Sequence, residues 1–345
     1  MADAPLIPLT IEAITEEVPG FRTICFAPGH GILYKAGQFL TLLRRFGGTE
    51  VRRSYSIRSA PLLREPLSIG VRRIANGSFS RYLCDEARPG DVLHCTGAAG
   101  LFRLPDDPAA TPRYFFLAAG SGITPIRSLL QTALHGSSAR AVLVYSSHDP
   151  SVAIFRQELH TLREAFPGRF TLHELFSTEP DLRRARLTRD NFLGFLHSDG
   201  GDLRSTLFYT CGPESYMRLC TYLLRESGVP GAHIRREDFV ADRPAAPRPL
   251  PPDTGTHTAH LYLYGKAHDV EVRYPETILR AALRQGIALP YNCENGRCGS
   301  CAARCLEGTV WLARNEVLTD SDLAAGLTLT CTGHPSGGDV RLAFE

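Results

Sequence analysis

Four cysteines near the C-terminus have the spacing to hold a metal cluster. Cys293, Cys298 and Cys301 form the pattern C-x4-C-x2-C, and Cys331 follows thirty residues later. A cluster of two irons and two sulfides needs four thiolates, and three from one loop plus one from a neighbouring strand or turn suit it. Small residues such as Gly296 let backbone N–H groups approach the sulfurs. The spacing therefore predicts a one-electron carrier with a [2Fe–2S] cluster.

Three other interpretations of these cysteines compete with the cluster. A zinc site usually has two short C-x2–4-C pairs, and only one C-x2-C occurs here. A disulfide framework is disfavoured in a chain of 345 residues without a secretory signal, and chance spacing among ten cysteines is the third alternative. The flanking sequence favours the cluster. Residues 259–265 and 269–272 alternate like two strands of a hairpin, and residues 277–286 predict a short helix that stops at Gly286.

This order of strand, strand, helix and loop over residues 258–345 resembles the β-grasp ferredoxin module. The resemblance implies an α+β ferredoxin domain of the plant type, with the four spaced cysteines as its ligands. The other six cysteines are then not ligands, and Cys305, only four residues past Cys301, is the one most easily mistaken for one.

Length and composition indicate an ordinary globular protein of two or three domains. A formal charge of +2 gives no electrostatic case for binding nucleic acid or an anionic membrane. The N-terminus has an early acid and no long apolar run, so we expect no signal peptide, and no stretch reaches the ~20 apolar residues of a membrane-crossing helix. Ten cysteines without an export signal favour a reducing cytoplasm. The oligomeric state stays open.

Proline-rich residues mark the clearest domain boundary. The stretch 242–255 has the proline density of an extended tether, and we assign residues 243–257 to a linker. A softer boundary lies at residues 105–112. The chain is thus divided into domains at 1–108, 112–242 and 258–345, which makes the fold class multidomain.

Residues 1–108 contain short strand patterns separated by turn residues, which predicts a small antiparallel β-barrel. One strand carries the pattern R-x-Y-S at Arg53, Tyr55 and Ser56. Successive strand residues alternate between faces, so Arg53 and Tyr55 point one way and Ser56 the other. Taken alone, this pattern is equally typical of a half-buried strand with one charge.

A second pattern in this segment lies at residues 76–83. Gly77 and Ser78 begin a predicted helix, and backbone N–H groups at a helix start can bind phosphate. An ordinary N-cap at Ser78 would look the same. The sequence therefore leaves a phosphate site and a simple helix start both open at this point.

Residues 112–242 alternate strand and helix patterns, which predicts an α/β doubly wound fold with its ligand at the carboxyl ends of the strands. A buried strand at 113–119 runs into Gly120-Ser121-Gly122-Ile123-Thr124-Pro125 and then a helix through Leu134. Glycines here allow a pyrophosphate close to backbone N–H groups. A tight strand-to-helix turn, with proline favoured at its first turn, is the structural alternative.

Cys211-Gly212-Pro213 follows the strand at 205–211, and Glu237 and Phe239 close the segment. A lone buried cysteine is more often an inert core residue than a functional one. A surface acid and a core phenylalanine are the corresponding alternatives for Glu237 and Phe239. The position of Cys211 at a strand's carboxyl end, before Gly-Pro, favours a role beside the ligand.

These patterns together resemble the motifs of the ferredoxin–NADP reductase superfamily. The resemblance implies that Arg53 pairs with the flavin pyrophosphate, Tyr55 packs on the isoalloxazine and Ser56 hydrogen-bonds near N5. It implies that Cys211 positions the nicotinamide without attacking as a nucleophile, and that Glu237 lies near the active site. The catalytic residues are thus expected to be Ser56, Cys211 and Glu237.

The same resemblance assigns the cofactor-binding residues, with FAD favoured over FMN. For FAD they are Arg53, Tyr55, Ser56, Val71, Gly77, Ser78, Phe79, Ser80 and Phe239, and for NAD(P)H they are Gly120, Ser121, Gly122, Ile123, Thr124, Pro125, Ser146, His148, Arg156, Cys211, Gly212 and Pro213.

The residues expected to distinguish NADH from NADPH differ in this sequence from those of several relatives. These place an arginine for the 2′-phosphate after the second nucleotide strand, whereas this chain has Ser146-Ser147-His148-Asp149. No acid for a ribose diol stands at Ser146 or Ser147 either. Arg156 is the available substitute, and on that basis we lean to NADPH.

The three domains in this order resemble the reductase subunits of multicomponent oxygenases, and most closely the phenylacetyl-CoA epoxidase reductase type. The resemblance implies an NAD(P)H-dependent oxidoreductase. NAD(P)H would deliver a hydride to FAD, and single electrons would leave through the cluster to an oxygenase or hydroxylase component. Two alternatives stay open, namely the same relay serving a dehydratase or a separate carrier, and a redox-sensing subunit without turnover. Electrostatic steering of an acceptor is not expected, because residues 258–345 carry a net charge of only −2.

Overall fold

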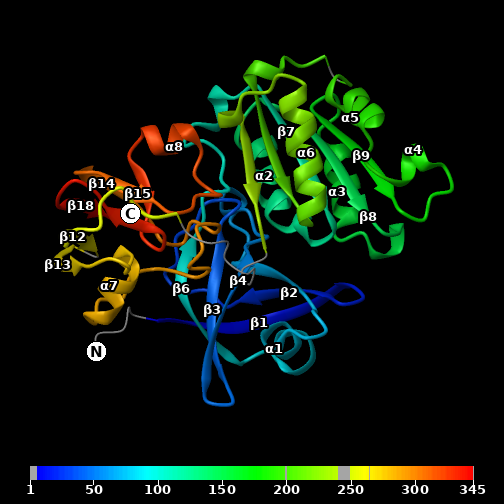
Figure 1. The fold of residues 1–345 in the computed structure, drawn as a ribbon. Coiled ribbons are helices and arrows are strands. Elements are labelled where there is room, and N and C mark those ends of the chain that lie inside the picture. Colours follow the sequence, from blue (N-terminus) through cyan, green and yellow to red (C-terminus); the bar gives the residue numbers. More distant parts are fainter. Residues whose placement is uncertain (1–5, 199, 240–248, 264, 345) are drawn as a thin grey trace. The chain divides into compact units, whose positions relative to one another are not determined.

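The computed structural model describes residues 6–198, 200–239, 249–263 and 265–344, and it contains two compact units (Figure 1). The first unit consists of residues 7–98 and 102–238, and the second contains residues 99–101 and the chain from Phe239 onward. Most of the predicted linker at 243–257 lies outside the described residues, and its last residue, His257, begins a strand. None of the helices in the described ranges combines the length and the apolar composition that a membrane crossing requires.

The N-terminal part of the first unit is a six-stranded sheet in the order β4-β3-β6-β1-β2-β5. Its strands are β1 (Ile7–Val18), β2 (Phe21–Phe26), β3 (Phe39–Phe46), β4 (Thr49–Ser56), β5 (Ser68–Arg72) and β6 (Val92–Ala99), and its short helical turns are η1 (Pro61–Leu63), α1 (Ser78–Arg81) and the π-helical η2 (Tyr82–Glu86). A bridge between Ile57, directly after β4, and Ile69 of β5 joins the two ends of the sheet. The sheet therefore closes into the predicted antiparallel barrel. Its core is filled by alternating strand residues such as Leu40 and Leu42.

The second part of this unit is a five-stranded parallel sheet in the order β11-β10-β7-β8-β9. Its strands are β7 (Arg113–Ala119), β8 (Arg140–Ser147), β9 (Phe170–Phe176), β10 (Thr206–Cys211) and β11 (Ile234–Glu237), its α-helices are α2 (Ile123–Gly136), α3 (Arg156–Ala165), α4 (Leu182–Ala185), α5 (Arg189–Leu196) and α6 (Glu214–Glu226), and its 3₁₀ turns are η3 (Pro108–Ala110), η4 (Gly120–Gly122), η5 (Pro150–Val152), η6 (Leu203–Ser205) and η7 (Gly231–His233). The strand order reverses between β7 and β10. A ligand of a doubly wound sheet is expected at the carboxyl ends of these two strands.

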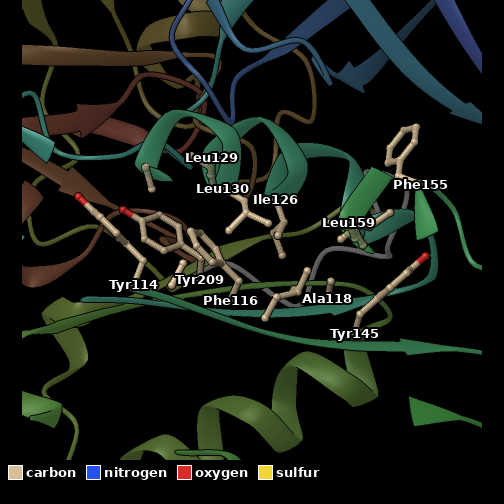
Figure 2. Close-up of a cluster of buried hydrophobic side chains, with 14 of the residues drawn as sticks. Tyr114, Phe116, Ala118, Ile126, Leu129, Leu130, Tyr145, Phe155, Leu159 and Tyr209 are labelled. Carbon is tan, nitrogen blue, oxygen red and sulfur yellow. The ribbon is translucent and has the colours of Figure 1, made fainter. Parts of the chain in front are cut away.

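Both faces of this sheet are covered, which explains why β7 is buried along its whole length. Figure 2 shows one face, where Phe116 and Ala118 of β7 pack against Ile126 and Leu129 of α2. The same cluster includes Phe21 of β2. Phe21 of the barrel therefore packs into the core of the parallel sheet, while the rest of the barrel keeps a core of its own.

The second unit holds a five-stranded mixed sheet in the order β13-β12-β18-β14-β16 and a two-stranded sheet of β15 and β17. The strands are β12 (His257–Leu263), β13 (Lys266–Val272), β14 (Ala302–Glu307), β15 (Val310–Leu312), β16 (Leu327–Leu329), β17 (Gly333–Pro335) and β18 (Val340–Ala343), and the helices are α7 (Ile278–Arg284) and α8 (Asp320–Ala324). The Thr277 hydroxyl accepts a hydrogen bond from Arg280 N and caps α7, and Gly286 follows its end at φ +78°. This confirms the predicted helix and its glycine stop.

Candidate functional site

The R-x-Y-S residues lie at the end of β4, beside the bridge that closes the barrel. Ser56 is buried, and its Oγ has no hydrogen-bond partner among the described residues. Burial raises the pKa of the Tyr55 hydroxyl, and the Tyr55 ring meets the Phe79 ring edge-on at 5.9 Å. Arg53 is exposed. A buried hydroxyl without a partner is unfavourable unless another group satisfies it, so Ser56 fits the polar edge of a bound flavin.

The turn before α1 requires a glycine for packing reasons. A Cβ at Gly77 would lie 2.5 Å from the Ser80 Oγ, which accepts a hydrogen bond from Ile74 N at 3.2 Å. Phe79 and Val71 are buried in the barrel core, whereas Ser78 is exposed. A helix does start at Ser78, but it has only one turn before it widens into η2. Within this motif, the structure thus gives Phe79, Ser80 and Val71 packing roles, and their contact with FAD stays a prediction.

The loop Gly120–Pro125 leads from β7 into α2 at the point where the strand order reverses. Gly120 has a left-handed φ of +54°, and a Cβ there would meet no atom within 4 Å. A Cβ at Gly122 would lie 2.1 Å from the carbonyl oxygen of Cys211. Thr124 Oγ1 donates to the carbonyl of Ser121 at 2.8 Å, which holds the turn. Open space at Gly120 fits the backbone approach of a pyrophosphate, while Gly122 lets two strand ends meet.

Cys211 and Glu237 are paired in register at the carboxyl ends of β10 and β11. Burial, followed by repulsion from Glu237, raises the pKa of the Cys211 thiol well above its usual value. Burial, followed by repulsion from Asp238, raises the pKa of Glu237 to about 8. Both groups are therefore uncharged at neutral pH, so Cys211 is a neutral side chain suited to contact and not a thiolate nucleophile.

Two of the predicted nucleotide residues lie where β8 ends, and a third lies at the start of α3. Ser146 Oγ is buried without a partner among the described residues, and His148 is exposed. Arg156 does not stand alone, because its Nε donates to Glu174 Oε1 at 2.9 Å and His160 Nε2 lies 2.9 Å from the other carboxylate oxygen. The Glu174 carboxylate is therefore already paired with Arg156, the residue that the sequence analysis proposed for the 2′-phosphate of NADPH.

Phe239, the predicted flavin neighbour, is 44% exposed. The structure assigns it to the second unit, whereas Glu237 belongs to the first. Its role beside the flavin stays a prediction.

The predicted cluster ligands converge within the second unit. Cys293, Cys298 and Cys301 lie in the irregular loop between α7 and β14, and Cys331 lies in the turn between β16 and β17. Hydrogen bonds from Cys298 and Cys331 lower the pKa of the Cys293 thiol, and a hydrogen bond from Cys331 lowers the pKa of Cys301. The loop is tied to the turn, because N and Oγ1 of Thr330 both donate to the Cys301 carbonyl at 3.2 Å.

The backbone of this loop also turns toward the sulfurs. Asn295 N donates to Cys293 Sγ at 3.4 Å. Gly296 has φ +70°, and a Cβ there would lie 2.6 Å from the carbonyl oxygen of Arg314. Backbone amides directed at thiolates are the groups that stabilise a reduced, more negative cluster. The predicted role of small residues in this loop is consistent with this geometry.

The arrangement of thiols bears on the zinc alternative. In the described part of the chain, no group of three or more His, Cys, Asp or Glu side chains surrounds a position for one metal ion. The four predicted ligands lie close enough together for their thiols to shift one another's pKa values. The preference for a two-iron cluster over zinc therefore rests on the ligand spacing, with three cysteines in one loop and a distant fourth.

Cys305, on β14, has separate partners at and just after the end of that strand. Its thiol donates to the carbonyls of Glu307 and Gly308 at 3.4 and 3.6 Å. The prediction that Cys305 is not a ligand is consistent with these contacts.

Comparison with known families covers all three parts of the chain. Residues 9–104 match an oxidoreductase FAD-binding domain, residues 116–221 an oxidoreductase NAD-binding domain, and residues 261–336 a 2Fe-2S iron-sulfur cluster binding domain. The chain is 32% identical, over 100% of both proteins, to the ferredoxin reductase component of 3-ketosteroid-9-alpha-monooxygenase from Mycolicibacterium smegmatis. The chain belongs to this family of oxygenase reductase components. The resemblance found in its motifs is thereby confirmed.

Another sequence relative and a solved structure are also similar to this reductase over nearly its whole length. A component of 1,2-phenylacetyl-CoA epoxidase from Escherichia coli is 32% identical over 98% of the chain and 97% of the relative. The solved structure of phthalate dioxygenase reductase has the same fold, with a TM-score of 0.59 and 22% identity over 98% of each chain. The fold class and the three kinds of cofactor-binding domain predicted from the sequence are confirmed.

The reductase also has residues that sequence reasoning missed. Arg127 on α2 contacts Glu65 of the barrel and Glu158 of α3. These three residues belong to no recognisable pattern, since Glu158 and Glu65 are 31 and 62 positions away from Arg127. The only sequence signal was a single arginine in a helix that has no lysine and no acidic residue, and such a residue is usually solvated.

Proposed function

We propose that this reductase takes a hydride from NAD(P)H and delivers single electrons to an oxygenase or hydroxylase component. The observation that carries the proposal is that the barrel and the nucleotide fold lie within a single unit, where Phe21 of the barrel packs into the core of the parallel sheet. The same chain supplies four converging thiols for a one-electron exit. Relatives named as the reductase component of a ketosteroid monooxygenase and as part of a phenylacetyl-CoA epoxidase support the kind of acceptor.

When bound, FAD accepts two electrons as a hydride and the [2Fe–2S] cluster transfers one electron at a time. The chain's own residues contribute binding and orientation. We assign Arg53 to the flavin pyrophosphate and Tyr55 and Ser56 to the ring, where the unpartnered Ser56 hydroxyl supplies a hydrogen bond. The backbone of Gly120 to Pro125 is assigned to the nicotinamide dinucleotide, and its open side at Gly120 supports this.

Cys211 and Glu237 are assigned to the reacting end of the nicotinamide. The neutral Cys211 thiol excludes water and offers a polarisable contact. Glu237, whose pKa burial raises to about 8, keeps a proton at neutral pH and can donate a hydrogen bond within the site. Neither group needs to act as a nucleophile, because hydride transfer depends on alignment.

The nicotinamide preference rests on Arg156. We keep NADPH as the proposed partner, but its preference over NADH is expected to be less than tenfold. The reason is that Glu174 already neutralises Arg156, so a 2′-phosphate would have to compete with a carboxylate at 2.9 Å. Comparing kcat/KM for the two nicotinamides tests this, and a tenfold preference for NADH would rule NADPH out.

Anaerobic mixing of the loaded protein with NAD(P)H tests the central proposal. We expect the flavin absorbance to bleach on a catalytic timescale and the cluster absorbance to follow. Absence of bleaching with both nicotinamides would favour the redox-sensing alternative. If both cofactors are reduced but no oxygenase component accepts the electrons, the relay serves a dehydratase or a separate carrier. A location in the cytoplasm, where thiols stay reduced, is part of the proposal.

A further inference from the structure

A partly buried ion cluster lies inside the first unit, where the barrel meets the nucleotide fold. Arg127, in the first half of α2, keeps only 6% of its side chain exposed. Its guanidinium donates to both carboxylate oxygens of Glu65 at 2.6 and 2.8 Å, and its Nε donates to Glu158 Oε1 at 2.7 Å. Arg58 Nη2 donates to the second oxygen of Glu158 at 3.0 Å. Two cations and two anions thus balance one another within the cluster.

Hydrogen bonds from side chains of α2 to backbone carbonyls after β4 join the same two segments as the ion cluster. Arg127 Nη1 donates to the Arg58 carbonyl at 3.0 Å, and Ser128 Oγ donates to the Ser59 carbonyl at 2.6 Å. Ser59 Oγ in turn accepts from Ser68 N of β5 at 3.1 Å. The first turns of α2 are therefore fixed to the segment that leaves β4.

These hydrogen bonds join residues that lie directly after the two proposed cofactor-binding motifs. Arg58 and Ser59 follow Ser56 by two and three residues, and Arg127 and Ser128 follow Pro125 by two and three. The two segments bonded to each other are therefore those that directly continue the flavin strand and the nucleotide loop. A shift in this junction would displace one motif against the other.

Arginine is the residue type that this geometry needs. Its planar guanidinium engages two carboxylates and a carbonyl at once, whereas a lysine ammonium is a single point charge. The Glu65 carboxylate also accepts from Ala60 N at 2.7 Å, so the acid itself is held by the loop after β4. The bidentate contact thus connects α2 to the loop after β4, which also holds the Glu65 carboxylate through Ala60 N.

We propose that Arg127 is a positioning residue, which sets the separation of the flavin and nicotinamide sites through its contacts with Glu65 and Glu158. This inference rests on the proposed function, because it assumes that the two motifs bind a hydride acceptor and its donor. Misplacement of reacting groups by about 1 Å can lower a rate about 100-fold. The junction therefore controls hydride transfer through the relative position of the two motifs.

The test compares Arg127→Lys with Arg169→Lys in the full-length loaded protein. Arg169 is a matched control, because its Nη2 donates to the carbonyls of Leu134 and Ser137 at 3.0 and 2.6 Å at the other end of α2. Both variants are expected to lower the midpoint of thermal unfolding. Only Arg127→Lys is expected to slow flavin reduction at saturating NAD(P)H, by about 10- to 100-fold, with the KM for the nicotinamide changed less than about threefold.

Amide hydrogen exchange in the protein without nicotinamide supplies a readout other than activity. In Arg127→Lys, residues 57–60 and 123–128 should both exchange faster, because each loses its partner across the junction. In Arg169→Lys, faster exchange should be confined to residues 134–140. Glu65→Gln serves as a second variant if Arg127→Lys does not fold, and it should show the same paired change.

The outcomes separate the inference from the function on which it rests. If NAD(P)H fails to reduce the wild-type flavin, the proposed function is wrong. If the wild type is reduced and Arg127→Lys is reduced equally fast, with the two variants equally destabilised, Arg127 is only structural and the positioning inference is overturned. Faster exchange in one of the two segments alone would also contradict it.

Discussion

Residues of the proposed hydride site come from the ends of separate strands, β4, β7, β10 and β11, whereas three of the four cluster cysteines come from one loop between α7 and β14. In the strand-end site, contacts such as the one between Gly122 and Cys211 join segments remote in sequence. In the loop, glycines with positive φ shape the chain locally. The first site should therefore be sensitive to packing far from its ligands, and the second to the loss of a single ligand.

The largest effect is expected in the loop. Cys331→Ser removes one of four thiolates and should abolish or distort the visible absorption of the cluster. Cys305→Ser is the matched control, since that thiol donates its hydrogen bonds to the carbonyls of Glu307 and Gly308. An unchanged spectrum in Cys331→Ser, or a lost one in Cys305→Ser, would show that the ligands are misassigned.

The next largest effect is expected at the strand ends, where a larger side chain in place of a glycine should lower the stability of the fold. Gly122→Ala places a Cβ 2.1 Å from the Cys211 carbonyl oxygen, and the overpacking should destabilise the protein by about 3 kcal/mol. Gly120→Ala meets no neighbour but is strained at φ +54°, which costs about 1–2 kcal/mol. Denaturant unfolding measures both. Equal destabilisation by the two alanines would mean that strand-end packing is not the governing factor.

Glu237 gives the strand-end site a pH dependence. Its folded pKa of about 8 lies above the unfolded value of about 4.3, so its contribution is fully present below about pH 4.3 and is lost as pH rises through 8. Glu237→Gln removes this loss. The stability of the variant relative to the wild type should therefore be higher at pH 8 than at pH 5, by on the order of a few kcal/mol. Denaturant unfolding at both pH values checks this, with the exposed Glu86→Gln as a control that should show no such difference.

The smallest effect concerns the nicotinamide. Glu174→Gln frees the Arg156 guanidinium from its carboxylate partner and should raise the ratio of kcat/KM for NADPH over NADH about threefold to tenfold, since a charge-assisted contact is worth about 1 kcal/mol at a half-exposed site. Glu164→Gln, on the exposed face of the same helix as Arg156, should leave the ratio unchanged. A ratio that does not move in Glu174→Gln would exclude Arg156 from recognition of the 2′-phosphate.

The two regions also differ in how much the sequence reveals. The ligands of the cluster loop could be predicted because three of them lie close together in the sequence, and their spacing alone suggests the ligand set. The motifs around Ser56 and Gly120 could be located in the same way. Gly122 was assigned to pyrophosphate binding, but the structure shows that it also gives room to the Cys211 carbonyl. Such a contact depends on which strands are neighbours, and no local pattern encodes that.

Charged pairs were the least predictable feature. Arg156 was offered as the cation for a 2′-phosphate, whereas Glu174 on β9 already pairs with it. Arg127 belongs to no recognisable sequence motif, although it is the most buried member of an ion cluster. In both cases the partner comes from another element. The outcome therefore depends on tertiary packing, which overrides what the residue type alone suggests.

The place of β18 has a consequence for biosynthesis. This strand is the last of those described, yet it lies in the middle of its sheet, between β12 and β14. During translation, the hairpin of β12 and β13 and the pair of β14 and β16 both keep an open edge until β18 leaves the ribosome. All four cluster cysteines have emerged by then. We therefore expect iron to be loaded only after β18 has joined the sheet, and a ribosome stalled before Val340 to expose ligands that have no finished fold to hold them.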